Sequence, residues 1–365
     1  MSTKTLTIRC HCRSAHFTLT VEPTLLPLRA HLCHCTLCRT THGTTASYHA
    51  PLPEGVKPSF IAPSSWDNLT AYTPPGSGAK LYFCSTCGCQ VGGTNVFGIW
   101  DTVVSTIEGG NEEDAIWVID EHIYTEKGST GDGGIAELLP QIGGRELRVW
   151  NPEVRGTEFP IAASGAASGA AGRSAPHNRQ DDKLLAQCNC GGVSFSISRP
   201  REDFINSPLS KGWIHPSDRT KWLALLDVCD DCRLLTGAHV TTWLFVPIDH
   251  ITPSLPDDLL IGTMKRYEST PGTVSRTFCG TCGATVFCYY DKRGGIVDIA
   301  TGILRAPEGV MLSDWAVWRT AKLGFKDDGR RYDKLFTEGL EEGAKEWGRR
   351  VHGEVIDFQG GPATD

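Results

Sequence analysis

Three cysteines lie within six positions in the stretch CHCTLCR (residues 33–39), and a C-x-x-C pair follows in FCSTCG (residues 83–88). Three neighbouring cysteines cannot all pair with one another as disulfides, but their sulfurs can all point at one metal ion. Both stretches return in altered form later in the chain, as DVCDDCR (residues 227–233) and FCGTCG (residues 278–283). The sequence therefore predicts two related copies of one metal-binding unit.

Length and composition narrow the class of protein. A chain of 365 residues exceeds the size at which a single hydrophobic core usually stops growing, so two domains are expected. A formal charge of -7 provides no basic excess for nucleic acid or an anionic membrane, and we expect neither as a partner. No apolar run resembles a secretion signal or a membrane span, which favours a cytoplasmic protein.

The fifteen cysteines suit either a disulfide framework or a set of metal sites. A reducing compartment keeps thiols free, and C-x-x-C pairs there are more often ligands or redox groups. We therefore predict Zn²⁺ as the cofactor rather than disulfides.

Three segments are predicted from composition. Residues 1–151 are dense in short apolar and β-branched runs separated by Gly, Pro, Ser and Thr, which is typical of a mainly β domain. Residues 152–182 are rich in Gly, Ala and Ser and read as a flexible linker. Residues 183–357 repeat the strand pattern, with about sixteen extra residues between the C-x-C pair and Asp227. Here the two copies are named the first copy and the second copy.

Several residues recur in register in the two copies, which supports an internal duplication. Arg39 and Gly43 follow the first triplet as Arg233 and Gly237 follow the second, and Tyr72 corresponds to Tyr267. Near the end of the chain, helical spacing predicts a short amphipathic helix over residues 333–350, although two glycines interrupt it. Its apolar positions are Leu335, Phe336, Leu340, Ala344 and Trp347, and its glycines are Gly339 and Gly343.

Each copy combines a C-x-C pair with a distant C-x-x-C pair. Alternate residues of an extended segment face the same side, so both kinds of pair can direct two sulfurs at one ion. Four thiolates close the tetrahedron of a structural zinc. We predict one such site at Cys10, Cys12, Cys84 and Cys87, and a second at Cys188, Cys190, Cys279 and Cys282.

The triplet of Cys33, Cys35 and Cys38 has no obvious fourth cysteine. Three protein ligands and one open position are typical of a catalytic zinc, where water or substrate occupies the fourth place. The alternative is a third structural site whose fourth ligand is one of the nearby residues His34, His42, Cys89 or His122.

In the second copy the corresponding residues are Asp227, Cys229 and Cys232. A carboxylate can bind zinc, so the site is predicted as a metal site with a harder ligand set. Loss of the metal is the alternative, and the second copy would then be a degenerate one.

The order C-x-C, C-x-C-x-x-C-R and F-C-x-x-C-G resembles the glutathione-dependent formaldehyde-activating enzyme family, also called the centromere protein V family. The resemblance implies two Mss4-like β domains in tandem. It implies structural zinc at Cys10, Cys12, Cys84 and Cys87 and catalytic zinc at Cys33, Cys35 and Cys38. It also implies a carbon–sulfur lyase or synthase acting on a thiol adduct, of the glutathione type, of a small carbonyl compound.

Two histidines are candidates for proton transfer beside the triplet. His122 resembles a histidine that family members often carry, and His42 lies four positions after Cys38. Arg39 and Arg233 persist where the triplet has changed, so we interpret them as structural. Two alternative functions remain open: a zinc enzyme that tailors an electrophilic metabolite without glutathione, and a non-enzymatic binding protein whose zinc ions are all structural.

Overall fold

A computed structural model of the chain describes residues 3–112, 115–126, 131–151, 157–158, 182–216 and 218–358. The predicted linker at residues 152–182 lies almost wholly outside these residues, so it stays a prediction, as do the boundaries on either side of it. In the described part of the chain, the helices are not long and apolar enough to cross a membrane.

The first copy contains a nine-stranded sheet in the order β14-β13-β10-β3-β4-β9-β8-β7-β6 and a three-stranded sheet in the order β1-β2-β5. In β1, Leu6 and Ile8 are buried while Thr7 and Arg9 are partly exposed, which is the alternation of a half-buried strand. The single α-helix described in this copy is α1 (Thr36–His42). The strands are β1 (Lys4–Arg9), β2 (His16–Val21), β3 (Leu28–Cys33), β4 (Ser47–Pro51), β5 (Ser59–Phe60), β6 (Leu69–Tyr72), β7 (Lys80–Cys84), β8 (Gln90–Thr94), β9 (Trp100–Val103), β10 (Trp117–Ile123), β11 (Gln141–Ile142), β12 (Arg145–Glu146), β13 (Arg148–Asn151) and β14 (Thr157–Glu158).

The second copy contains a seven-stranded sheet in the order β20-β21-β22-β23-β18-β17-β24 and a three-stranded sheet in the order β15-β16-β19. Every residue of β17 and β18 is buried, as expected for strands at the centre of a covered sheet. The strands are β15 (Lys183–Gln187), β16 (Ser194–Ser198), β17 (Trp222–Asp227), β18 (Thr241–Pro247), β19 (Ile251–Thr252), β20 (Met264–Thr270), β21 (Val274–Cys279), β22 (Thr285–Tyr290), β23 (Ile296–Ala300) and β24 (Ala316–Trp318). The helices are α3 (Glu202–Ile205), α4 (Asp230–Thr236), α5 (Lys326–Tyr332) and α6 (Lys334–His352).

The two large sheets share one strand order. Reading β6-β7-β8-β9-β4-β3-β10 against β20-β21-β22-β23-β18-β17-β24 matches each strand of the first copy to one of the second. The single parallel pair in each run is also equivalent, β3 with β10 and β17 with β24. The predicted duplication and the mainly β class are therefore confirmed.

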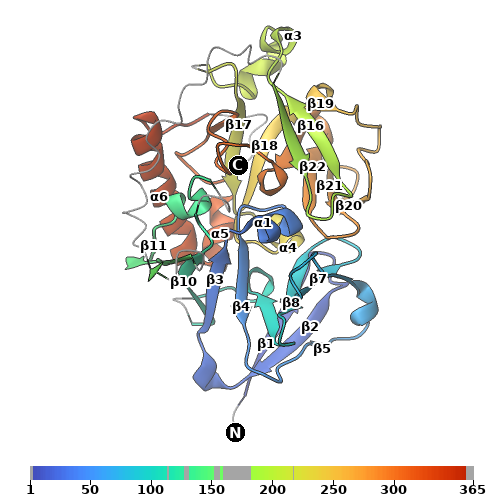
Figure 1. Cartoon of the computed structure of the whole chain (residues 1–365), viewed down its shortest axis with the longest axis vertical. Coiled ribbons are helices and arrows are strands. Elements are labelled where there is room, and N and C mark those ends of the chain that lie inside the picture. The colour runs from blue at the N-terminus through green and yellow to red at the C-terminus, as the bar shows by residue number, and fades with distance from the viewer. Residues whose placement is uncertain are drawn as a thin grey trace.

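The two copies pack end to end along the long axis of the molecule, with α1 and α4 at the level where they meet (Figure 1). One continuous hydrophobic core runs through both copies. Two equivalent backbone hydrogen bonds cross the boundary, from His11 N–H to Leu234 O and from Asn189 N–H to Thr40 O, each 3.0 Å long. The contact between the copies is thus approximately two-fold symmetric.

Gly43 and Gly237, which recur in register in the sequence, end α1 and α4 in left-handed backbone conformations. Each also lies against the other copy. A Cβ on Gly43 would lie 2.3 Å from the backbone oxygen of Thr285, and a Cβ on Gly237 would lie 2.4 Å from that of Gln90. The two glycines therefore allow the helices to end in a left-handed conformation, and they also leave room for the backbone of the other copy.

The predicted C-terminal helix is confirmed as α6, which packs on the first copy against the 3-10 helix Gly134–Leu138 and against β11. Its two interior glycines have a packing role. A Cβ on Gly339 would lie 2.7 Å from Gln141 O, and one on Gly343 would lie 2.0 Å from Leu138 O. The C-terminal helix α6 of the second copy therefore packs closely against the backbone of the first copy.

Candidate metal centres

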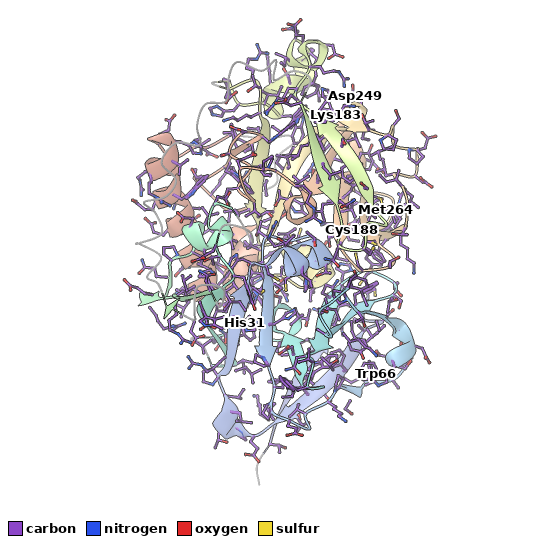
Figure 2. The ribbon with its side chains drawn as sticks, in the orientation of Figure 1. His31, Trp66, Lys183, Cys188, Asp249 and Met264 are labelled. Atoms are coloured by element: carbon purple, nitrogen blue, oxygen red, sulfur yellow. The ribbon has the colours of Figure 1, made fainter. Side chains whose placement is uncertain are left out.

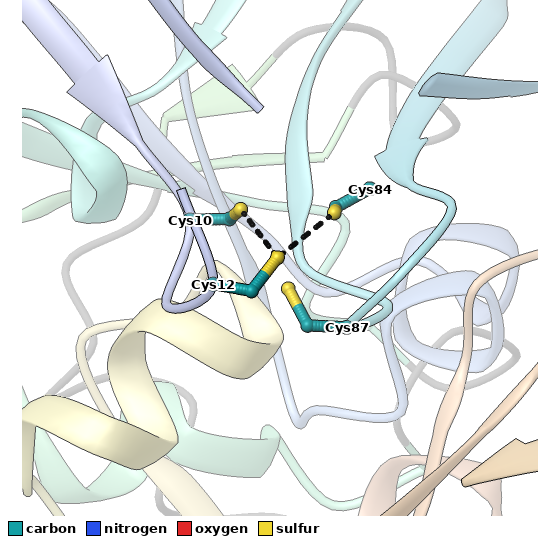
Figure 3. A group of neighbouring side chains, drawn as sticks. All are labelled: Cys10, Cys12, Cys84 and Cys87. Atoms are coloured by element: carbon teal, nitrogen blue, oxygen red, sulfur yellow. Dashed lines mark hydrogen bonds between the residues drawn. The ribbon is translucent and has the colours of Figure 1, made fainter. Parts of the chain in front are cut away.

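Four cysteine sulfurs of the first copy converge at the ends of β1 and β7 (Figure 3). The Sγ atom of Cys12 lies 3.5 Å from those of Cys10 and Cys84, and all four sulfurs, including that of Cys87, lie within 4.8 Å of one another. Four thiolates around zinc, with Zn–S near ~2.3 Å, place the sulfurs about 3.8 Å apart. The donor set and its spacing therefore fit a structural zinc.

The equivalent group of the second copy, Cys188, Cys190, Cys279 and Cys282, meets the same distance criterion. Backbone N–H groups point at its sulfurs, with Val193 donating to Cys188 Sγ at 3.3 Å and Gly192 to Cys190 Sγ at 3.4 Å. Such donors stabilise thiolates, the form that binds metal. Figure 2 shows Cys188 near the end of the second copy that faces the first.

The triplet of the first copy is formed where β3 passes into α1. Cys33 ends the strand, Cys35 is the N-cap of the helix, and Cys38 lies in its first turn, where its N–H donates to Cys35 Sγ at 3.4 Å. The three sulfurs lie within 4.8 Å of one another. Hydrogen bonds from Cys33 and Cys38 lower the pKa of the Cys35 thiol to about 3. The fold therefore presents three sulfurs and favours a thiolate among them.

Among the described residues, this group of potential metal ligands contains the three cysteines alone. Of the four residues considered as a fourth ligand, Cys89 lies beside the other cluster, where its carbonyl accepts the N–H of Cys84. His34 and His122 contact each other, with His34 Nε2 lying 2.8 Å from His122 Nδ1. His42 directs Nδ1 at the backbone oxygen of Cys38 at 2.9 Å.

His122 is fully buried on β10, and its Nε2 lies 2.9 Å from Leu139 O. A carbonyl only accepts, so Nε2 carries the proton, and Nδ1 accepts from His34. Burial lowers the pKa of His122 to about 4. Both ring nitrogens therefore have protein partners, and the predicted catalytic role of His122 stays a prediction.

Three histidines lie together beside the triplet. His42 Nε2 lies 3.2 Å from His49 Nε2, and His31 on β3 is the cross-strand partner of His49 on β4. Burial lowers the pKa values of His31 and His42 to about 4, and the charge of the Cys35 thiolate acts in the opposite direction on both. Figure 2 labels His31 on its strand.

Of these three histidines, the sequence pattern pointed to His42 but not to His31 or His49. The sequence does indicate His31, because alternate residues of a strand share a face and His31 lies two positions before Cys33. The spacing of residues along the chain does not predict the pairing of β3 with β4, which places His49 beside the other two histidines.

The second triplet is also assembled. Asp227, Cys229 and Cys232 place their ligand atoms within 4.8 Å of one another at the start of α4. A further residue not singled out in the sequence joins them, because Arg276 on β21 donates from Nη1 to Cys232 Sγ at 3.3 Å.

The histidine group does not recur in the second copy. Matching the strand pairs β3-β4 and β17-β18 puts Leu225 at the place of His31 and Trp243 at the place of His49. Thr236 takes the place of His42. All three histidines are therefore replaced in the copy whose first triplet cysteine is replaced.

The two arginines that follow the triplets contact backbone. Arg39 Nε donates to His34 O at 3.2 Å, and Arg233 Nη1 donates to Ser105 O of the first copy at 2.6 Å. The Arg233 guanidinium also lies 3.5 Å above the Tyr332 ring. These contacts support the structural interpretation of both arginines.

A cavity of about 520 Å³ lies between the copies, on the side of α4. Its three guanidinium groups are paired with acids: Arg9 with Glu108 at 2.7 Å, Arg233 with Asp230 at 2.7 Å, and Arg331 with Asp328. The charges that line it are thus balanced within the protein, and neither triplet contributes a cysteine to its wall.

All fifteen cysteines are free thiols, and all but Cys89 and Cys288 belong to one of the four groups described above. A family model described as glutathione-dependent formaldehyde-activating enzyme matches residues 5–127 and, a second time, residues 217–319. No curated protein and no solved structure matches the chain. The two family matches together span more than half of the sequence, and each contains one triplet. The chain belongs to the glutathione-dependent formaldehyde-activating enzyme family and carries two copies of its unit.

Proposed function

We propose that the first copy is a zinc-dependent enzyme that forms or cleaves a carbon–sulfur bond between a thiol of the glutathione type and a small carbonyl compound. The observation that carries the proposal is the gathering of the Cys33, Cys35 and Cys38 sulfurs without a fourth protein ligand among the described residues. The family match supports glutathione as the thiol and formaldehyde as the carbonyl compound.

The donor set of the triplet fits zinc, since three thiolates are soft ligands that bind it well. Cys33, Cys35 and Cys38 would hold the ion, which, when bound, supplies a Lewis acid that can bind the substrate thiolate or polarise the carbonyl group. The reaction itself is balanced without a redox partner. The thiol sulfur bonds to the carbonyl carbon, and the thiol proton passes to the carbonyl oxygen.

We assign the proton transfer to the pair of His42 and His49. His42 donates from Nδ1 to Cys38 O, so its Nε2 is the acceptor that faces His49 Nε2. Burial lowers the pKa of His42 to about 4, which keeps its imidazole neutral at neutral pH. We favour this pair over His122 because His42 bonds to the backbone of Cys38 and its pKa responds to the charge of Cys35, whereas His122 contacts His34 and Leu139.

The test measures formation of the hydroxymethyl thioether from glutathione and formaldehyde. Wild-type protein and a Cys89→Ala control should catalyse it, because Cys89 belongs to none of the four groups. A folded Cys35→Ser variant should be inactive. Equal turnover by the Cys35→Ser variant would refute the proposal.

The same assay separates the alternatives. Turnover of a carbonyl substrate that does not depend on glutathione would favour an enzyme that works without a thiol. Absence of turnover in the wild type, with every zinc resistant to exchange, would favour a non-enzymatic binding protein. We also propose a cytoplasmic location, where reducing conditions keep these thiols free.

A further inference from the structure

A positively charged side chain, that of Arg276, contacts the second triplet. Arg276 is 8% exposed, lies on β21 and donates from Nη1 to Cys232 Sγ at 3.3 Å. The equivalent position on β7 of the first copy is Leu81, which lies three residues before Cys84 as Arg276 lies three before Cys279. A guanidinium group is always charged, so a buried positive charge that bonds directly to a triplet sulfur distinguishes the second triplet from the first.

The carboxylate that replaces the first cysteine is already bonded within the protein. Asp227 Oδ1 accepts the N–H of Cys229 at 2.9 Å, and Asp227 Oδ2 accepts the S–H of Cys232 at 3.3 Å. The atoms predicted to bind metal therefore have partners that satisfy them without an ion.

Two guanidinium groups near the second triplet are also accompanied by carboxylates. The Asp227 carboxylate offsets the Arg276 guanidinium, and the neighbouring Arg293 forms an ion pair with the buried Asp298. A divalent ion would add further positive charge beside the Arg276 guanidinium, in a site of low dielectric.

We infer that the second triplet does not bind metal and that the Arg276 guanidinium takes the place of the ion. The chain then holds zinc at both four-cysteine sites and at the first triplet, and Cys229 and Cys232 form a metal-free dithiol. This inference concerns the second copy and stands apart from the proposed function of the first. It replaces the prediction that Asp227, Cys229 and Cys232 are ligands.

The experiment counts zinc per chain in the purified full-length protein. The wild type should hold about three ions, and a Cys229→Ser variant should hold the same number. If the Cys229→Ser variant does not fold, Asp227→Asn replaces it, because this substitution keeps the shape of the side chain. The Asp227→Asn variant should also hold about three ions. Loss of about one zinc from either folded variant would overturn the inference, because the arginine would then be an outer partner of a metal-bound thiolate.

Exchange of the two distinguishing residues provides a gain-of-function test. The double variant Asp227→Cys with Arg276→Leu copies the first triplet and should bind about one additional zinc. In the first copy, Leu81→Arg should release about one zinc. A double variant that folds but gains no zinc would count against the role assigned to Arg276. Failure of the proposed function appears instead as an unchanged zinc count in Cys35→Ser.

Discussion

The hydroxyl group of Tyr72 donates a 2.6 Å hydrogen bond to Oδ1 of Asn189, the residue between the two cysteines of the second C-x-C pair. The reciprocal contact joins Tyr267 to His11, the residue between Cys10 and Cys12, with the hydroxyl 2.9 Å from Nδ1. Each four-cysteine loop is therefore braced by a tyrosine from the other copy. The candidate four-cysteine metal sites are therefore linked directly to the contact between the copies.

Removing one of these hydroxyl groups should weaken the contact between copies. Tyr72→Phe leaves Asn189 Oδ1 without this donor and should lower the free energy of unfolding by about 1 kcal/mol, measured by urea denaturation. The control is Tyr82→Phe, because no hydrogen bond to another described residue is seen for the Tyr82 hydroxyl. Equal stability of the two variants would show that the bond between copies contributes nothing.

The close approach of α4 to the first copy can be tested with two glycines of equal backbone conformation. Gly237 and Gly98 both have φ of +75°, but a Cβ on Gly98 would meet nothing within 4 Å. Gly98→Ala should cost only the conformational penalty of about 1 kcal/mol. Gly237→Ala should cost clearly more, because its Cβ would collide with Gln90 O. Similar unfolding midpoints for the two variants would contradict this packing.

The buried histidine His122 makes stability depend on pH. Burial holds its folded pKa at about 4, below the ordinary value of 6.5, so the unfolded chain binds more protons between these values. Its contribution to stability is present above pH 6.5 and is lost as the pH falls toward 4. In this window the free energy of unfolding of His122→Gln should change less steeply than that of the wild type, by about 1.4 kcal/mol per pH unit. Parallel pH profiles would show that His122 is not held neutral by the fold.

The histidine pair beside the triplet should matter for turnover. Replacing His42 with Gln keeps a hydrogen-bonding side chain but removes the base, and should lower kcat by about 100-fold or more. His16→Gln, at the start of β2 and outside the pair, serves as the control. A loss of less than about threefold in His42→Gln would move the proton-transfer role to another group, with His122 next to be tested.

Much of the architecture could be predicted because the cysteine spacing is local. The members of all four groups, the duplication and the helix that became α6 follow from the order of residues along the chain. What could not be predicted depends on strand pairing. His49 approaches His42 through the register of β3 and β4, and Arg276 reaches Cys232 from β21, more than forty positions further along the chain.

The sequence nevertheless marks Arg276 as unusual. In two copies aligned on their cysteines, an arginine stands where the other copy has Leu81, within a buried strand. A charge at a buried position needs a partner, and Asp227, the carboxylate that replaces the first cysteine of the triplet, is a candidate of opposite charge. Comparing the copies at apolar positions, and not only at cysteines, would have shown it.

The most direct test of the account measures zinc content and carbon–sulfur bond formation in the same preparations of wild-type and Cys35→Ser protein. The account predicts that the variant stays folded on its two four-cysteine sites, loses about one zinc per chain and loses its turnover. A folded Cys35→Ser protein that keeps either its full zinc content or its activity would contradict the assignment of the first triplet as the catalytic metal site.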